Sequence, residues 1–119
     1  MSSLIVMRST PYGNTNAKDA LDVALTLAAF EQEPALLYEG RGVLQLLLSS
    51  QMDTPFKHLG KILSALPMYD IEHIYIDKDS LTECGIDAKQ LQNLPVQCRL
   101  LDATQVSDLF QQHQHVMVF

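Results

Sequence analysis

The sequence predicts an α/β fold in which a parallel sheet is covered by helices on both faces. Short apolar runs alternate with segments whose apolar residues recur at the helical period, and this alternation occurs five times. The first of these runs, Leu4–Met7, is continuously apolar, which is typical of a central strand that is buried on both faces. The 119 residues suffice for one domain with one hydrophobic core, so we expect a single domain over residues 1–119.

The first half of the chain contains two predicted strand–helix units. Leu4–Met7 is predicted to be a central strand, and the turn-forming stretch Ser9–Thr15 separates it from a helix over Asn16–Glu31. The alanines on one face of that helix would let it lie close to a sheet. Ala35–Tyr38 is the second predicted strand, and Glu39–Gly42 is the loop at its carboxyl end.

The next segment, Val43–Leu48, is apolar nearly all round. This pattern predicts either deep burial or a contact with another subunit. A further helix begins at Thr54, with Pro55 at its first position. The inner stripe of that helix consists of Phe56, Leu59, Leu63 and Leu66.

The stretch after Leu66 contains the junction that bears most on function. Pro67 ends the preceding helix because proline has no amide hydrogen and its ring clashes with the preceding turn. Ile71–Ile76 is predicted to be a buried strand, and Asp77–Ser80 opens a short helix that Gly85 ends. Reactive groups in open α/β sheets collect where a strand ends and a helix begins, and here the residue at that place is an aspartate.

The remaining chain supplies two more predicted strands and one helix: Val96–Leu101, Asp102–Gln112 and His115–Phe119. Right-handed crossovers favour a flavodoxin-like three-layer sandwich with five mainly parallel strands in the order 2-1-3-4-5. In that order a crevice lies between the first and third strands. Ser9–Asn14 and Asp77–Ser80 would line it, with Glu39–Gly42 nearby, so three loops are expected to converge on one rim.

Composition and charge exclude several function classes. The formal net charge is −6, and the eight Lys and Arg residues form no cluster, so direct binding of nucleic acid is not expected. No secretory signal is present, and no apolar run approaches the roughly 20 residues of a membrane span. Cys84 and Cys98 fit no disulfide framework and no metal spacing. We therefore expect a reduced cytoplasmic protein without a membrane segment.

Each candidate site has a plainer interpretation. The Ser9–Thr15 loop could hold a phosphate, as in a small flavin- or nucleotide-binding module, but a strand-to-helix turn is favoured. Asp77 could be a general base, but a helix cap is favoured. Cys84 lies just before Gly85, at the helix end where the dipole disfavours a thiolate, so an unreactive thiol is favoured over a sulfur carrier.

Four further residues have weak signals. His113 and His115 are two residues apart, but no other metal ligand stands at a recognisable spacing, so we expect no metal and no cofactor. Cys98 is interpreted as a small core or boundary residue. Arg41, between two glycines, is the charged residue most suspected of a partner contact.

Several short motifs together resemble one family. They are Pro11-Tyr12-Gly13, Ala20-Leu21-Asp22, Gly40-Arg41-Gly42-Val43-Leu44-Gln45-Leu46-Leu47, Leu66-Pro67-Met68-Tyr69-Asp70-Ile71-Glu72, and Ser80-Leu81 followed by Gly85. In this order and at these spacings the sequence resembles the TusC/DsrF branch of the DsrE-like sulfur-relay proteins. The similarity extends over nearly the whole chain.

The resemblance implies a subunit of a cytoplasmic heterohexamer with TusB-like and TusD-like chains. Such complexes pass persulfide sulfur from a TusA-like carrier to a TusE-like carrier for 2-thiolation of the tRNA wobble uridine, or serve dissimilatory sulfur oxidation in the Dsr system. The reactive cysteine belongs to the TusD/DsrE chain, and Asp77 occupies that position here. The resemblance therefore implies a non-catalytic docking subunit and no enzyme activity of its own.

The docking candidates on this interpretation are Tyr12, Arg41, Val43, Leu44, Leu46 and Leu47. The sequence leaves open whether the isolated chain forms a homo-oligomer.

Overall fold

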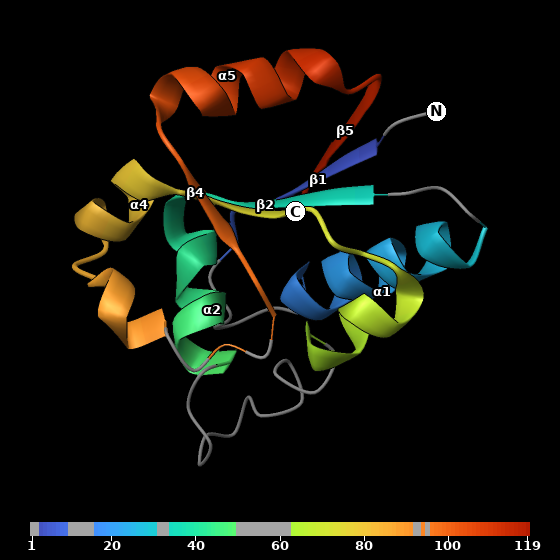
Figure 1. Ribbon diagram of the computed structural model, residues 1–119, viewed down its shortest axis with the longest axis horizontal. Helices are drawn as coiled ribbons and strands as arrows, with labels where there is room; N and C mark the ends of the chain where they lie inside the picture. The colour runs from blue at the N-terminus through green and yellow to red at the C-terminus, as the bar shows by residue number, and fades with distance from the viewer. Residues whose placement is uncertain (1–2, 10–15, 31–33, 50–62, 92–93, 95) are drawn as a thin grey trace.

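The protein is a three-layer α/β/α sandwich around a parallel sheet (Figure 1). The computed structural model describes residues 3–9, 16–30, 34–49, 63–91, 94 and 96–119, without the side chains of residues 16–17, 47–49 and 88. The five strands are β1 (Ser3–Met7), β2 (Pro34–Tyr38), β3 (Ile74–Asp77), β4 (Arg99–Leu101) and β5 (His115–Val118). The α-helices are α1 (Asn16–Ala29), α2 (Val43–Ser49), α4 (Lys78–Glu83) and α5 (Ala103–Gln112). Three short 3₁₀ segments are η1 (Gly40–Gly42), η2 (Leu66–Tyr69) and η3 (Ala88–Leu91).

The predicted α/β class and parallel sheet are confirmed, but the predicted strand order 2-1-3-4-5 is wrong. The observed order is β4-β3-β2-β1-β5, and every strand pair is parallel. From β1 to β4 the chain adds each strand on the same side of its predecessor. It then crosses back over the sheet so that β5 pairs with β1. The predicted crevice between β1 and β3 therefore does not exist, because β2 lies between them.

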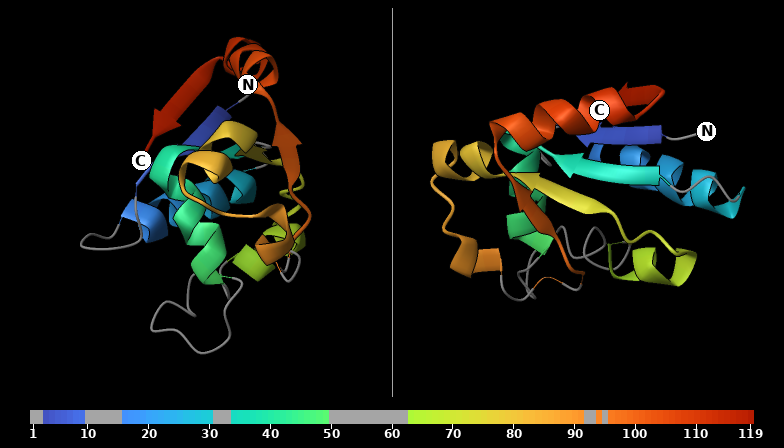
Figure 2. Two further views of the ribbon diagram at one scale, coloured as in Figure 1. Left: turned by 90° about the vertical axis from the view of Figure 1, so that its left-hand side faces the viewer. Right: turned by 45° about the horizontal axis from the view of Figure 1, so that its top comes forward.

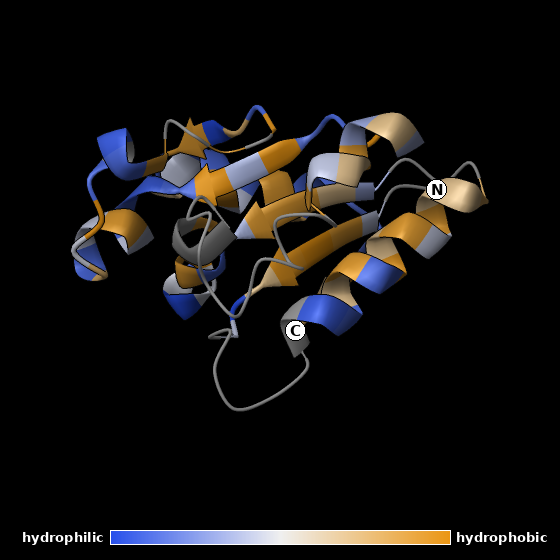
Figure 3. Ribbon diagram, turned by 90° about the horizontal axis from the view of Figure 1, so that it is seen from below, coloured by the Kyte–Doolittle hydropathy of each residue, from blue (hydrophilic) through white to orange (hydrophobic). Residues whose placement is uncertain are grey.

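This topology decides which helices cover each face. A right-handed crossover that reverses direction along the sheet must run over the opposite face. Figure 1 and both views in Figure 2 accordingly show α5 alone on one face, with α1, α2 and α4 on the other. Apolar strand residues, orange in Figure 3, lie between these layers.

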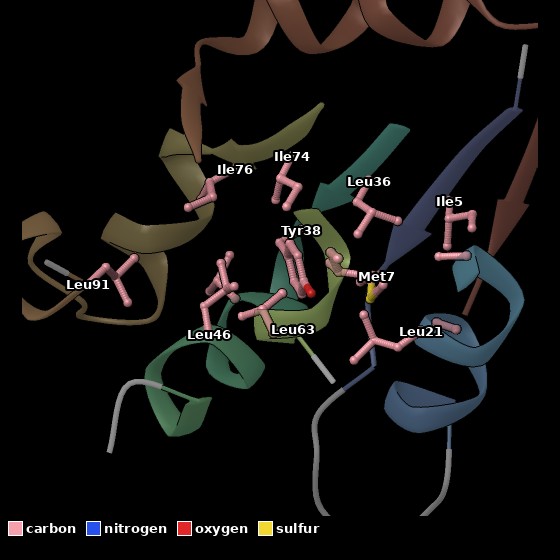
Figure 4. Close-up of a cluster of buried hydrophobic side chains, with 14 of the residues drawn as sticks. Ile5, Met7, Leu21, Leu36, Tyr38, Leu46, Leu63, Ile74, Ile76 and Leu91 are labelled. Carbon is pink, nitrogen blue, oxygen red and sulfur yellow. The ribbon is translucent and has the colours of Figure 1, made fainter. Parts of the chain in front are cut away.

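Each face has its own hydrophobic core. The larger core lies under α1, α2 and α4, where Tyr38 is surrounded by Leu36, Leu46, Leu63 and Ile76 (Figure 4). Burial raises the pKa of the Tyr38 phenol far above its usual range. The smaller core lies under α5 and consists of Leu4, Val6, Ala35, Leu37, Leu101 and Leu109.

Local sequence explains several boundaries. Asp102 caps α5 reciprocally: its carboxylate accepts from the Gln105 amide at 2.8 Å, and the Gln105 side chain accepts from the Asp102 amide at 2.9 Å. The strand predicted over Ile71–Ile76 begins only at Ile74. The backbone of Asp70, which follows η2, is left-handed, and residues 71–73 after it have no regular secondary structure. Of the helix predicted from Thr54 to Leu66, residues 63–66 lie within the described chain; residues 63–65 are α-helical, and Leu66 begins the 3₁₀ segment η2.

None of the helices in the described part of the chain combines the length and apolar character needed to cross a bilayer.

Candidate functional site

The candidate site is the carboxyl edge of the sheet, where the segments that follow β1, β2 and β3 meet. Glu39–Gly42, which follows β2, is the central one of the three because β2 lies between β1 and β3. The Glu39 amide donates to the Met7 carbonyl at 3.1 Å, and the Gly40 amide donates to Ser80 Oγ at 2.8 Å. The predicted convergence of three rim segments is therefore present, but in a different order.

Gly42 allows the close approach of η1 to β1. A Cβ atom built on Gly42 would lie 1.7 Å from the Met7 carbonyl oxygen and 2.5 Å from its carbon. No side chain fits in that space, so Gly42 must be glycine for the chain to turn here. Gly40 adopts a positive φ of 56°, which glycine adopts readily. The Gly-Arg-Gly spacing thus has a steric cause in the backbone.

The segment after β1 is held from both sides. Arg8 forms an ion pair with Glu39, and the Arg8 amide donates to the Phe119 carbonyl at 2.8 Å. On the other side, Nε2 of the buried Gln45 donates to the Ser9 carbonyl at 2.8 Å. The sequence interpretation missed this role of Gln45. The signal for it was a single amide within an otherwise apolar run.

Asp77 lies at the predicted strand–helix junction, but its carboxylate does not cap the backbone of α4. Asp77 is the last residue of β3 and the N-cap residue of α4, yet it makes no side-chain capping bond. Asp77 Oδ2 instead accepts a hydrogen bond of 2.7 Å from Ser80 Oγ, which in turn accepts the Gly40 amide. The buried Ser80 hydroxyl therefore links β3 and α4 to η1. The sequence indicated Ser80 only as part of the Asp77–Ser80 segment and the Ser80-Leu81 motif, and this linking role was missed.

No thiol stands at the start of α4. The Ser80 proton is donated to Asp77, and its oxygen accepts from a backbone amide, so both functions of the hydroxyl are used within the protein. A carboxylate at residue 77 cannot form the sulfur–sulfur bond of a persulfide.

The two cysteines lie elsewhere. Cys84 is half-buried at the carboxyl end of α4, and its Sγ lies 3.7 Å from the Gly40 carbonyl oxygen, to which the thiol can donate. A thiolate could not donate this hydrogen bond. Cys98 lies just before β4 and packs against the larger core, where burial raises the pKa of its thiol to about 11. At neutral pH Cys98 is therefore a protonated thiol and a poor nucleophile.

The structure divides the predicted docking residues. Val43 and Leu46 are fully buried in the core of this chain, so they are unavailable to a partner, and that part of the prediction is wrong. The physical reason is that α2 packs directly beneath the sheet (Figure 4). Leu44 is half-buried against the same core.

Arg41 is exposed and has no ion-pair partner among the described residues. Tyr12, the Ser9–Thr15 loop beyond Ser9 and the Leu47 side chain lie outside the description.

The histidine pair shows no metal-binding arrangement. His113 Nδ1 lies 2.8 Å from the Leu109 carbonyl oxygen at the end of α5, and His115 is exposed in β5. Within the described ranges, no three side chains of the metal-binding types gather closely enough to hold an ion.

Comparison with known proteins agrees with these features. The profile described as the DsrE/DsrF-like family matches residues 1–119. The chain belongs to the DsrE/DsrF-like family. A Protein TusC homolog of Pseudomonas aeruginosa is 31% identical over 117 residues, which cover 98% of this chain and 96% of the relative. The intracellular sulfur oxidation protein DsrF of Allochromatium vinosum is 29% identical, covering 94% of this chain and 91% of DsrF.

A solved structure supports the fold of this DsrE/DsrF-like chain. The crystal structure of the ychN protein from E. coli matches with a TM-score of 0.71 at 15% identity, covering 100% of this chain and 99% of that one. At this identity the match bears on the fold alone. The resemblance to the TusC/DsrF branch that the Gly40–Leu47 and Leu66–Glu72 motifs indicated is confirmed by the family match and the two relatives.

Proposed function

We propose that this protein is a non-catalytic docking subunit of a cytoplasmic sulfur-relay complex. Its partners would be TusB-like and TusD-like chains, and it would meet TusA-like and TusE-like carriers only through the assembled complex. The reactive cysteine of the relay would lie on another chain. Membership in the DsrE/DsrF-like family and the TusC and DsrF names of its relatives support the sulfur-relay role.

The arrangement around Asp77 is the observation that carries the non-catalytic part of the proposal. By the family resemblance, residue 77 is where the reactive chain has its cysteine. Asp77 instead accepts from Ser80 and helps to fix the η1 segment. Neither Cys84 nor Cys98 lies at the start of α4.

Within η1, Arg41 is the side chain best placed to contact a partner. It is exposed, whereas its neighbours Gly42 and Val43 are buried and hold it in position. Arg8 and Glu39 neutralise each other in an ion pair, so Arg41 presents the charge of this loop to the outside. An acidic surface on a partner would complement it.

Co-expression tests the assembly. We expect the chain to co-purify with TusB-like and TusD-like chains of the same genome and to elute with them as one species. Arg41→Glu should weaken co-purification, whereas Lys89→Glu, the same charge reversal at an exposed lysine of η3, should not. A chain that elutes apart from both partners contradicts the proposal.

For the pathway, we propose 2-thiolation of the tRNA wobble uridine, with dissimilatory sulfur oxidation as the alternative. Deletion of the gene should then abolish 2-thiouridine in digested tRNA, measured by nucleoside mass spectrometry. Unchanged 2-thiouridine together with a defect in sulfur oxidation would favour the alternative.

One observation keeps a second candidate open. Cys84 is half-buried beside Gly40, at the same edge of the sheet as Asp77, so it could act as a sulfur carrier. Intact-mass analysis after exposure to a persulfide donor separates the two. A sulfur adduct that Cys84→Ser abolishes supports the carrier, and no adduct supports the docking subunit.

A further inference from the structure

The two margins of the sheet differ in how they are protected against pairing with another strand. Soluble proteins shield such edges with charged residues, proline, short strands or bulges, because the free backbone groups of an edge strand template further pairing. β4 is only three residues long and begins with the exposed Arg99. β5 (His-Val-Met-Val) contains no proline, lysine, arginine or carboxylate, and Val116 and Val118 are 39% and 50% exposed.

The backbone of β5 has a free hydrogen-bonding side. The Phe119 amide donates to Val6 at 2.9 Å, and the Phe119 carbonyl accepts from Arg8 at 2.8 Å, so both polar groups of residue 119 face β1. In a parallel pair, alternate residues direct both groups to the same neighbour. The amide and carbonyl groups of Val116 and Val118 therefore point away from β1, and among the described residues β5 pairs with β1 alone.

The side chains of β5 are self-complementary in one antiparallel register. Val116 and Val118 are paired with Leu4 and Val6, so they stand on the α5 face of the sheet. If two copies of β5 pair about a two-fold axis centred on Met117, each Val116 lies opposite a Val118 of the other copy. These are the residues whose backbone groups point outward, so they form hydrogen-bonded pairs, and valine–valine contacts are favourable across strands. This register opposes no two charged side chains.

The opposite face offers a matching recess. A hollow of about 700 Å³ lies between α1 and β5, bordered by Leu27, Phe30, His115 and Met117. Phe30, at the rim of this hollow, is 74% exposed. In the register centred on Met117, Phe119 of the second copy lies opposite His115, on the face that carries this hollow.

We propose that β5 is a self-association edge that pairs antiparallel with β5 of a second copy of this chain. The two sheets then join into one continuous sheet, with the valine pairs on the α5 face and Phe119 of each copy at the hollow of the other. The pairing rests on the geometry of β5 and not on the sulfur-relay proposal, so either can fail without the other.

Light scattering over a wide concentration range tests the pairing. The full chain should shift from monomer to dimer as its concentration rises. Val118→Lys should weaken dimerisation by about tenfold or more, because a lysine on a strand edge opposes pairing. Leu100→Lys is the matched control on β4, where the leucine is 40% exposed, and it should dimerise like the original chain. The urea midpoint of each variant shows that it is folded.

Cysteine crosslinking tests the register. Met117 residues related by the axis form a non-hydrogen-bonded pair with Cα atoms about 4.5 Å apart, within reach of a disulfide. Each His115 would lie opposite Phe119 of the other copy, four residues further along the strand. The two His115 residues would therefore be about 13 Å apart. Met117→Cys should therefore form a disulfide-linked dimer on mild oxidation, and His115→Cys should not.

Three results overturn the proposal. They are a chain that stays monomeric at every concentration, a Val118→Lys variant that dimerises as well as the original, and a His115→Cys variant that crosslinks as readily as Met117→Cys.

Discussion

β2 and β5 both pair in parallel with β1, yet the protein treats them differently. Every residue of β2 is buried, and the segment that follows it contacts both the end of β1 and the start of α4. β5 has three exposed residues and one half-buried residue over a similar length. The fold thus concentrates its burial and its hydrogen bonds between segments along β2 and the carboxyl edge, while the β5 margin remains accessible for association.

The largest effect should come from Gly42, at the end of the β2 unit. Gly42→Ala places a methyl group against the Met7 carbonyl, which cannot move without disturbing β1. We expect a loss of about 3 kcal/mol or more in the free energy of unfolding, measured by urea denaturation. Gly40→Ala, which meets no atom within 4 Å but keeps the positive φ, should cost only about 1–2 kcal/mol. Equal losses for the two variants would refute the steric role of Gly42.

Truncating one apolar side chain in each strand compares the strands directly. Leu36→Ala in β2 leaves a cavity in the larger core, so we expect a loss of about 2–5 kcal/mol. Val118→Ala removes a half-exposed side chain, and we expect a loss below about 1 kcal/mol. Both losses in the free energy of unfolding are measured by urea denaturation, at a concentration where the chain is monomeric. A Val118→Ala loss as large as that of Leu36→Ala would break the contrast between the strands.

The Ser80 hydroxyl should have an intermediate effect on stability. Ser80→Ala leaves the Gly40 amide and the Asp77 carboxylate without this partner, and we expect a loss of about 1–3 kcal/mol. Amide hydrogen exchange at Gly40 should become faster, because its acceptor is gone. Unchanged protection at Gly40 would show that another group holds η1 in place.

The smallest effect concerns the pH dependence of stability. Burial raises the pKa of Cys98 to about 11, so the folded protein keeps the proton over a range in which the unfolded chain loses it. The contribution of the protonated Cys98 thiol to the free energy of unfolding is fully present at neutral pH. It falls as the pH rises above the ordinary pKa of a thiol, by at most about 1.4 kcal/mol per pH unit. Cys98→Ala should make the fall in the free energy of unfolding between about pH 9 and pH 10 less steep. In that range the ionisation of tyrosines contributes less to the fall than it does at higher pH. An equally steep decline in the variant would contradict this assignment.

The sequence predicted the layers because the apolar runs and helical periods follow directly from burial. It did not predict the strand order, because the same alternation of strands and helices fits several right-handed topologies. Which margin β5 joins depends on tertiary packing of α5. The apolar pattern of Val43–Leu48 was equally compatible with a core helix and a subunit interface. Only the position of this helix beneath the sheet shows that Val43 and Leu46 belong to the core.

At the site, the sequence located the strand–helix junction at Asp77 but not its hydrogen bonds. The contact between Ser80 and Gly40 joins residues far apart in the chain, and no local pattern encodes it. The requirement for Gly42 was visible only as a Gly-x-Gly spacing. Its cause is the approach of β1, which the sequence does not show.

A reconstituted relay offers the most direct test of a docking subunit without a reactive thiol. The chain carrying both Cys84→Ser and Cys98→Ala would be assembled with TusB-like and TusD-like partners, and transfer of sulfur to a TusE-like carrier would be followed by intact mass. We predict that this cysteine-free chain assembles and supports transfer at the same rate as the original. Normal assembly with transfer abolished would contradict the account, because it would place a sulfur-carrying step on this chain.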